Sequence, residues 1–253
     1  MFATNPFAEI SGSIPPAVMQ SYVVVMIVLV AAGTLFDVVH KGSAKYFFDN
    51  WRKSRSKGSQ QADVVSIAVK TAVVDVLASG EFCNARRRAA HLLTMYGFVL
   101  HVISTVVMVF NYSTDSVWAH LWWIGGLMVL AGGYWFWFFI RVDVAAEGNS
   151  PFRLVKADLF ILSLLASATL GLVWAFLQAR GSAASVTVFG LYILATTVLF
   201  AGVPWSKFAH MFFKPAAAFE KRVSYANDTR SNLPAPADKP ETFGIARGQP
   251  RNY

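Results

Sequence analysis

The stretch that decides the fold is VVVMIVLVAAG, residues 23–33, at the centre of an apolar run from 17 to 39. Asp37 is the one charged residue in that run. A membrane-spanning helix needs about 20 consecutive apolar residues, because only a helix satisfies its own backbone hydrogen bonds in lipid. No basic residue precedes the run, unlike in a cleavable signal, so we expect it to remain as a permanent transmembrane helix.

Four more apolar runs follow, at residues 89–112, 118–140, 159–177 and 185–213. Only 14% of the residues are charged, whereas a soluble domain carries about 25%. These features predict an all-α integral membrane protein built as a bundle of five transmembrane helices. The expected organisation is an N-terminal segment 1–16, a membrane domain 17–213 with a loop at 40–88, and an extended tail 214–253.

The distribution of Lys and Arg predicts the orientation of the five spans. The loop 40–88 contains ten of these residues, the loop after the third span three, and the tail from Lys207 eight. The segment before the first span and the loop after the second contain none, and the loop after the fourth contains only Arg180. Basic loops mark the cytoplasmic side. We therefore expect a periplasmic N-terminus and a cytoplasmic C-terminus, in a multi-pass protein of the bacterial cytoplasmic (inner) membrane.

The soluble parts are short and carry no motif for nucleic acid or phosphate binding. Residues 64–82 of the cytoplasmic loop read as a helix that lies either along the membrane or against a partner. Four prolines after residue 233 predict that the tail is extended. The chain has a single cysteine, so we expect no iron–sulfur cluster or structural zinc of its own.

The histidines are the candidate functional residues, because polar side chains are costly inside a membrane. His91 and His210 fall at similar depths near the cytoplasmic ends of the second and fifth spans. Two imidazoles placed in this way can clamp one haem iron. His101 lies ten residues beyond His91, about 15 Å further along the helix. It remains open whether His101 ligates a second haem, contacts a quinone or makes a structural hydrogen bond.

Two neighbouring positions bear on the haem interpretation. The apolar body of the fifth span offers Tyr192, but no histidine, as a ligand-capable side chain opposite His101. Gly97 lies between the two histidines of the second span, where it either lets a flat ring approach the backbone or allows close helix packing.

Two stretches, RRRAAHLLTMYGFVLH (residues 86–101) and PWSKFAHMFFKP (residues 204–215), resemble the nitrate reductase gamma-subunit-like family of haem b membrane anchors. The stretch KADLFILSLLASATLGLVWAF (residues 156–176) is similar to the family's helix after the cytoplasmic loop. Within the family, the absence of an iron–sulfur domain and the short tail most resemble the membrane anchors of dissimilatory adenylylsulfate reductase.

The resemblance implies that His91 and His210 hold a haem b near a cytoplasmic flavoprotein or iron–sulfur partner. His101 matches the histidine that serves the family's outer haem, but the matching histidine on the fifth span is missing. One haem is therefore the best expectation, with two or none as alternatives. The implied function is electron transfer between that partner and membrane quinone, as a subunit that is not catalytic by itself.

Two other functions remain open. The chain could be a cofactor-free structural anchor for a soluble redox enzyme, which the absence of a histidine in the apolar body of the fifth span favours. A small transporter is a third hypothesis, but the spans contain few charges and show neither an inverted repeat nor broken helix pairs.

Overall fold

The computed structural model describes residues 2–40, 42, 45, 47–52, 63–80, 82, 84–143, 148–203 and 214–227. In this part of the chain the regular elements are helices, and no strand occurs. Five helices are long and apolar enough to cross a membrane. They are α2 (Pro16–His40), α5 (Ala85–Val109), α6 (Ser116–Trp135) with its π-helical continuation η3 (Phe136–Ile140), α7 (Leu159–Ala179) and α8 (Ala184–Ala201). The predicted all-α, five-span architecture is confirmed.

The first four helices lie within a few residues of the predicted spans. α5 begins four residues early because Asn84 caps it: the Asn84 Oδ1 accepts hydrogen bonds from the backbone N–H groups of Arg86 (2.9 Å) and Arg87 (3.3 Å). α8 ends at Ala201, whereas the predicted span continued to residue 213. Residues 204–213 lie outside the described part of the chain.

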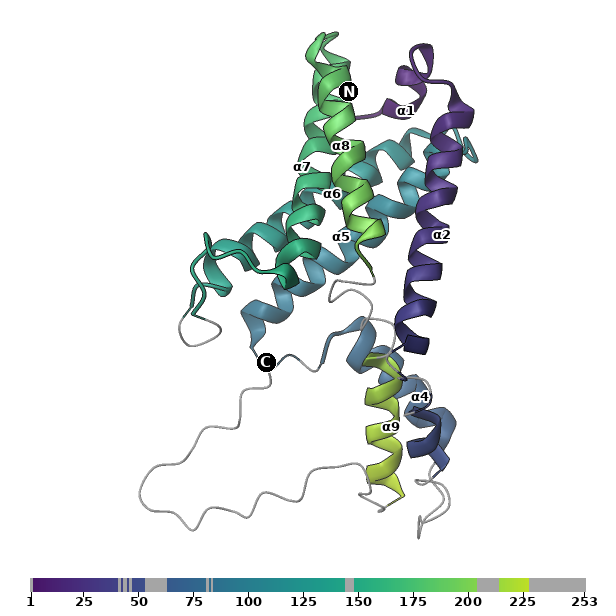
Figure 1. Cartoon of the computed structure of the whole chain (residues 1–253), viewed down its shortest axis with the longest axis vertical. Helices are drawn as coiled ribbons and strands as arrows, with labels where there is room; N and C mark the ends of the chain where they lie inside the picture. The colour runs from purple at the N-terminus through teal and green to yellow at the C-terminus, as the bar shows by residue number, and fades with distance from the viewer. Residues whose placement is uncertain are drawn as a thin grey trace. The chain divides into compact units, whose positions relative to one another are not determined.

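The chain divides into two compact units. The first consists of Met1–Thr34 and Ala89–Phe208, and holds most of the length of the five spans. In this unit α7 and α8 run side by side (Figure 1). The hydroxyls of Ser167 on α7 and Thr196 on α8 are hydrogen-bonded at 2.7 Å, which joins the two helices inside an apolar contact.

The N-terminal segment of this unit is folded rather than irregular. It forms α1 (Pro6–Glu9) and the 3₁₀ turn η1 (Ile10–Gly12), with Asn5 as N-cap and Pro6 at the first helical position. The Asn5 side chain also donates to the carbonyl of Met108, and Gln178 Nε2 donates to the carbonyl of Pro6 at 2.6 Å. These bonds fasten α1 to α5 and α7.

A buried ion pair closes the connection between α6 and α7. The Arg141 guanidinium lies over the Trp137 ring, 4.0 Å from its centroid, and donates to the Asp158 carboxylate at 2.6 Å. Asp158 ends the short 3₁₀ turn η4 (Lys156–Asp158), directly before α7. The Arg141 side chain is only 3% exposed, so this pair fixes the turn between two membrane helices.

The second unit consists of Leu35–Arg88 and Ala209–Tyr253. Its described helices include α4 (Val64–Lys70), which continues as the π-helix η2 (Thr71–Leu77), and α9 (Lys214–Ala226). Asp63 caps α4 by accepting from the N–H groups of Val65 and Ser66. The helix predicted over residues 64–82 is therefore confirmed for residues 64–77.

The expectation of an extended tail from residue 214 is wrong for its first part, because Lys214–Ala226 is helix α9. Pro215 in the first turn and the alanines that follow it favour a helix. Arg222 then pairs with Asp75 through two hydrogen bonds, at 2.7 and 2.8 Å, and Phe219 stacks on Trp51 at 5.2 Å. Residues 228–253 lie outside the described part. The side of the membrane on which each loop lies remains a prediction.

Candidate functional site

The candidate site is built on the contact between α5 and α6. A Cβ atom added at Gly97 would lie 2.7 Å from the carbonyl oxygen of Gly125, and one added at Gly125 would lie 2.7 Å from the backbone nitrogen of His101. A Cβ at Gly132 would lie 2.6 Å from the carbonyl oxygen of Ala90. The two backbones therefore touch along several turns, as small residues allow in membranes.

Gly97 is thus explained by helix packing. Its Cα faces the backbone of α6, so the space that its missing side chain leaves is already filled by protein. Of the two interpretations left open for this glycine, the structure supports close helix contact and not a cradle for a flat ring.

His101 lies one turn beyond Gly97 and is fixed by the same helix contact. Its Nδ1 is 2.9 Å from the backbone carbonyl oxygen of Trp122, and its ring stacks on the Trp122 indole with centroids 4.6 Å apart. A carbonyl oxygen only accepts hydrogen bonds, so Nδ1 carries the proton and donates. The other ring nitrogen, Nε2, then has a free lone pair in the neutral imidazole.

The Nε2 atom of His101 is buried and has no hydrogen-bond partner. The Ser104 hydroxyl, one turn further along α5, is also buried without a partner. Burying an unsatisfied polar atom costs free energy, and most such atoms in folded proteins are paired. A lone pair held in this way can ligate a metal or accept a proton from a bound hydroxyl group.

A hydrogen-bonded side chain supports the imidazole and its indole partner. Thr105 Oγ1 donates to the His101 carbonyl at 2.7 Å and accepts a hydrogen bond from Trp122 Nε1 at 3.0 Å. Trp122 is fully buried. The ring of His101 is therefore held on one side by an indole whose N–H group is itself hydrogen-bonded. This is the arrangement by which outer-shell contacts orient a metal-binding histidine.

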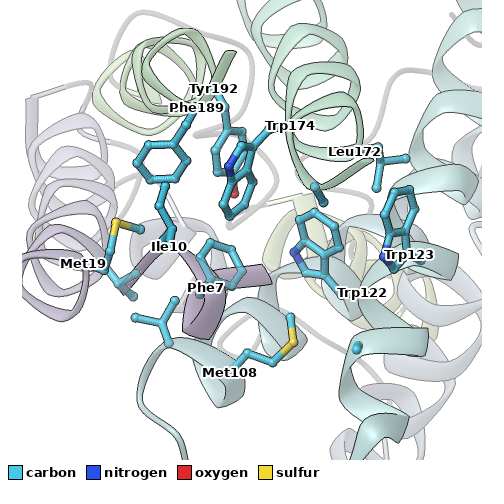
Figure 2. Close-up of a cluster of buried hydrophobic side chains, with 14 residues drawn as sticks. Phe7, Ile10, Met19, Met108, Trp122, Trp123, Leu172, Trp174, Phe189 and Tyr192 are labelled. Carbon is cyan, nitrogen blue, oxygen red and sulfur yellow. The ribbon is translucent and has the colours of Figure 1, made fainter. Parts of the chain in front are cut away.

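Beyond Trp122, an aromatic core fills the bundle (Figure 2). Phe7 from α1 contacts Trp122 edge-on at 6.0 Å and Trp174 at 5.2 Å. Tyr192 stacks on Trp174 with ring centroids 5.7 Å apart, and Phe189 lies 4.7 Å from Trp174. Tyr192, the ligand-capable residue expected opposite His101, is thus a buried member of this core.

The other two predicted ligands are placed differently. His91 lies near the start of α5 and is exposed. His210 falls outside the described residues, so the pairing of His91 with His210 remains a prediction. Of the three candidate histidines, His101 is the one that the structure shows buried with a free ring nitrogen.

Sequence reasoning found His101 but missed the group that orients it. The Trp122 contact is made by a backbone carbonyl, which has no signature in the sequence. The orphaned Ser104 hydroxyl was also missed, although its spacing of three residues from His101 on a helix could have suggested a shared face.

Comparison with known families adds one finding. The model of the citrate utilization protein B family matches residues 1–231. The chain belongs to this family. The match includes all five spans, the first unit with the segment around His101, and the second unit up to residue 231. It gives no support to the expected nitrate reductase gamma-subunit-like family or to an adenylylsulfate reductase anchor. No curated protein and no solved structure matches the chain.

Proposed function

We propose that this member of the citrate utilization protein B family is a membrane electron-transfer subunit that carries haem b. The proposal rests above all on His101: its Nδ1 is bonded to the Trp122 carbonyl, and its buried Nε2 has no partner. An imidazole with one nitrogen held by a carbonyl and a free lone pair on the other is the form that binds iron.

His101 would hold the haem iron through its unpartnered Nε2, and the helix contact beside it limits where the group could lie. The backbones of α5 and α6 touch at Gly97 and Gly125, so no flat ring fits between these two helices at that level. The macrocycle would have to lie on a side of His101 away from this contact. When bound, haem supplies a one-electron carrier inside the apolar bundle.

His91 and His210 are proposed as a second possible ligand pair. His91 and His101 lie ten residues apart on one helix, a rise of about 15 Å, so they cannot bind the same iron. A single haem is therefore held either by His101 with a ligand from another helix or by His91 with His210. Substitution of each histidine separately distinguishes these arrangements.

The proposed partners are a cytoplasmic flavoprotein or iron–sulfur subunit and a membrane quinone. The family's name associates its members with citrate utilization. We therefore expect the soluble partner to be an oxidoreductase of citrate utilization rather than adenylylsulfate reductase. In this arrangement, the chain conducts electrons and catalyses no reaction on the organic acid itself.

A cofactor-free anchor is the second candidate function. It is favoured by the aromatic core, in which the chain's own side chains fill the space around Trp122 and Trp174. Such a protein would recruit its soluble partner to membranes but would be colourless. The two proposals therefore differ in a property that absorption spectroscopy measures directly.

The test uses the full chain, produced in cells supplied with haem and reconstituted in lipid nanodiscs. A quinol is added under anaerobic conditions while the visible spectrum is recorded. Electron transfer predicts that b-type bands of reduced haem appear at a rate that increases with quinol concentration. Bands that form with dithionite but not with any quinol would contradict the quinone link. Their absence with both reductants would contradict the haem.

A further inference from the structure

The exposed surface of α4 and η2 has the opposite polarity to that of a helix in a soluble unit. Three valines at a spacing of four residues face outward: Val65, Val69 and Val73 are 73%, 59% and 51% exposed. Ala68 and Ala72, between them, are exposed as well. This spacing places the valines on one side of the helix, so they form one continuous apolar strip.

The opposite side of the same helix is polar and is covered by α9. Thr71 is buried there, and Asp75 pairs with Arg222 of α9. α9 itself buries Glu220 and Ser224, whose side chains are hydrogen-bonded at 2.9 Å. Polar groups are therefore buried here beside Val223, while the three valines of α4 and η2 face outward. Exposing these valines to water would cost free energy.

Exposed charges in the described part of this unit are strongly unbalanced. Six basic residues are exposed but only one acidic residue, Asp63. The basic residues are Lys45, Arg52, Lys70, Arg86, Lys214 and Lys221. Of the other carboxylates near the strip, Asp75 is paired with Arg222 and Glu220 is buried. An aliphatic strip in a unit with an excess of exposed cations is complementary to a surface of anionic phospholipids.

The position of the strip in the chain favours a bilayer over a protein partner. In the chain, Val65 to Leu77 lie between two membrane-spanning helices, α2 and α5, and seven residues separate Leu77 from the first residue of α5. The strip contains no aromatic residue or arginine, the types that supply most of the binding energy at protein interfaces. Small aliphatic side chains of this kind enter the headgroup boundary readily.

We propose that the strip formed by Val65, Val69 and Val73 is a membrane-surface site that enters the headgroup region of an anionic phospholipid leaflet. Exposed basic residues outside α9, such as Lys70 at the end of α4, bind the lipid phosphates. The site holds the α4–η2–α9 unit on the bilayer surface. This inference does not depend on haem binding, so its test is separate from the test of the proposed function.

The test measures how deeply single nitroxide labels lie in the bilayer. In a Cys83→Ser background, which removes the chain's one cysteine, Val69→Cys and Val73→Cys are labelled in the full chain in nanodiscs. Ala217→Cys, on the exposed side of α9 between Lys214 and Lys221, is the matched control. Collisions with oxygen report lipid, and collisions with a water-soluble nickel chelate report solvent.

With discs that contain phosphatidylglycerol, we expect labels at 69 and 73 to collide preferentially with oxygen and the label at 217 with nickel. In discs of phosphatidylcholine alone, or at about 1 M salt, the first two labels should move toward the solvent. Preference for nickel at both 69 and 73 in the anionic discs would overturn the proposal. An equal depth in both lipids would overturn its electrostatic part.

A second variant tests whether the strip itself holds the unit. Val69→Asp combined with Val73→Asp places two charges on exposed positions, so the contacts with α9 are preserved. A label at Val65→Cys should then become accessible to nickel. If that label remains in lipid, the strip is not what binds the membrane, and the proposal fails.

Discussion

The imidazole of His101 on α5 donates a hydrogen bond from Nδ1 to the backbone carbonyl of Trp122 on α6, 2.9 Å away. This bond leaves the Nε2 lone pair free inside the bundle, without a partner. It also stacks the imidazole on an indole. The proposal of a haem-binding membrane subunit depends on this relationship, and the first prediction tests it.

Replacing His101 by alanine should remove the b-type absorption bands of the purified chain, because the proposed iron ligand is lost. Added imidazole should restore part of the signal by entering the space left by the side chain. His120→Ala is the control, since that histidine is exposed and its Nδ1 bonds only to the Ser116 carbonyl one turn away. Full haem content in His101→Ala would show that His101 is not a ligand.

The glycine contact between α5 and α6 should tolerate no side chain. In Gly125→Ala the new Cβ would lie 2.7 Å from the His101 nitrogen and 2.8 Å from the Gly97 carbonyl oxygen, both backbone atoms. We expect a loss of about 1–3 kcal/mol in stability, typical of overpacking, and a lower melting temperature in detergent. Gly190→Ala is the matched control, because nothing lies within 4 Å of its Cβ position. Equal melting temperatures for the two variants would contradict the described contact.

Phe7 should fasten the N-terminal helix α1 to the bundle. It is 6% exposed and contacts both Trp122 and Trp174. Phe7→Ala should destabilise the chain by about 3–5 kcal/mol and expose the N-terminal segment to protease. Val18→Ala, at a position that is 55% exposed, should leave both properties unchanged. Equal protease resistance in the two variants would mean that α1 does not depend on Phe7.

The Asp75–Arg222 pair should stabilise the contact between η2 and α9 by about 1 kcal/mol, because both side chains are partly exposed. The measurement is a double-mutant cycle with Asp75→Asn and Arg222→Gln, read from hydrogen exchange of the α9 amides. A coupling free energy near zero would indicate that the two side chains act independently.

The titration of Arg222 gives a prediction of how the contact between η2 and α9 responds to pH. Hydrogen bonds to Asp75 raise the pKa of Arg222. A basic group whose pKa is higher in the folded state stabilises the fold at pH values below its unfolded-state pKa. That stabilisation is lost only as the pH rises through the folded-state pKa. Both values are strongly alkaline, so titration of Arg222 should leave α9 protection unchanged between about pH 7 and 9. A fall in protection over this range that Arg222→Gln abolishes would contradict this expectation.

Much of the membrane fold was predictable from the sequence, because hydropathy determines where a backbone can cross lipid. The burial of His101 was also foreseeable from its depth in the second span. The helices α1 and α9 were missed, although each carries local signals: Asn5 followed by Pro6, and Pro215 in a first turn before a run of alanines. For α9, the later prolines of the tail outweighed that signal in the prediction.

The parts of the candidate site that escaped prediction depend on tertiary contacts. Whether Gly97 serves a ring or a neighbouring helix is decided by the position of α6, and the partner of His101 is a backbone atom of Trp122. Likewise, whether Val65 and Val69 face outward depends on which side of α4 is covered by α9. Sequence periodicity identifies the sides of a helix but not what covers each of them.

The reduced-minus-oxidised spectrum of the purified full chain, with haem determined per polypeptide, tests the central claim most directly. We predict a Soret band and b-type bands on reduction, at a ratio of about one haem per chain. A colourless protein from cells supplied with haem, folded as judged by its helical content, would contradict the claim and leave the cofactor-free anchor as the better account.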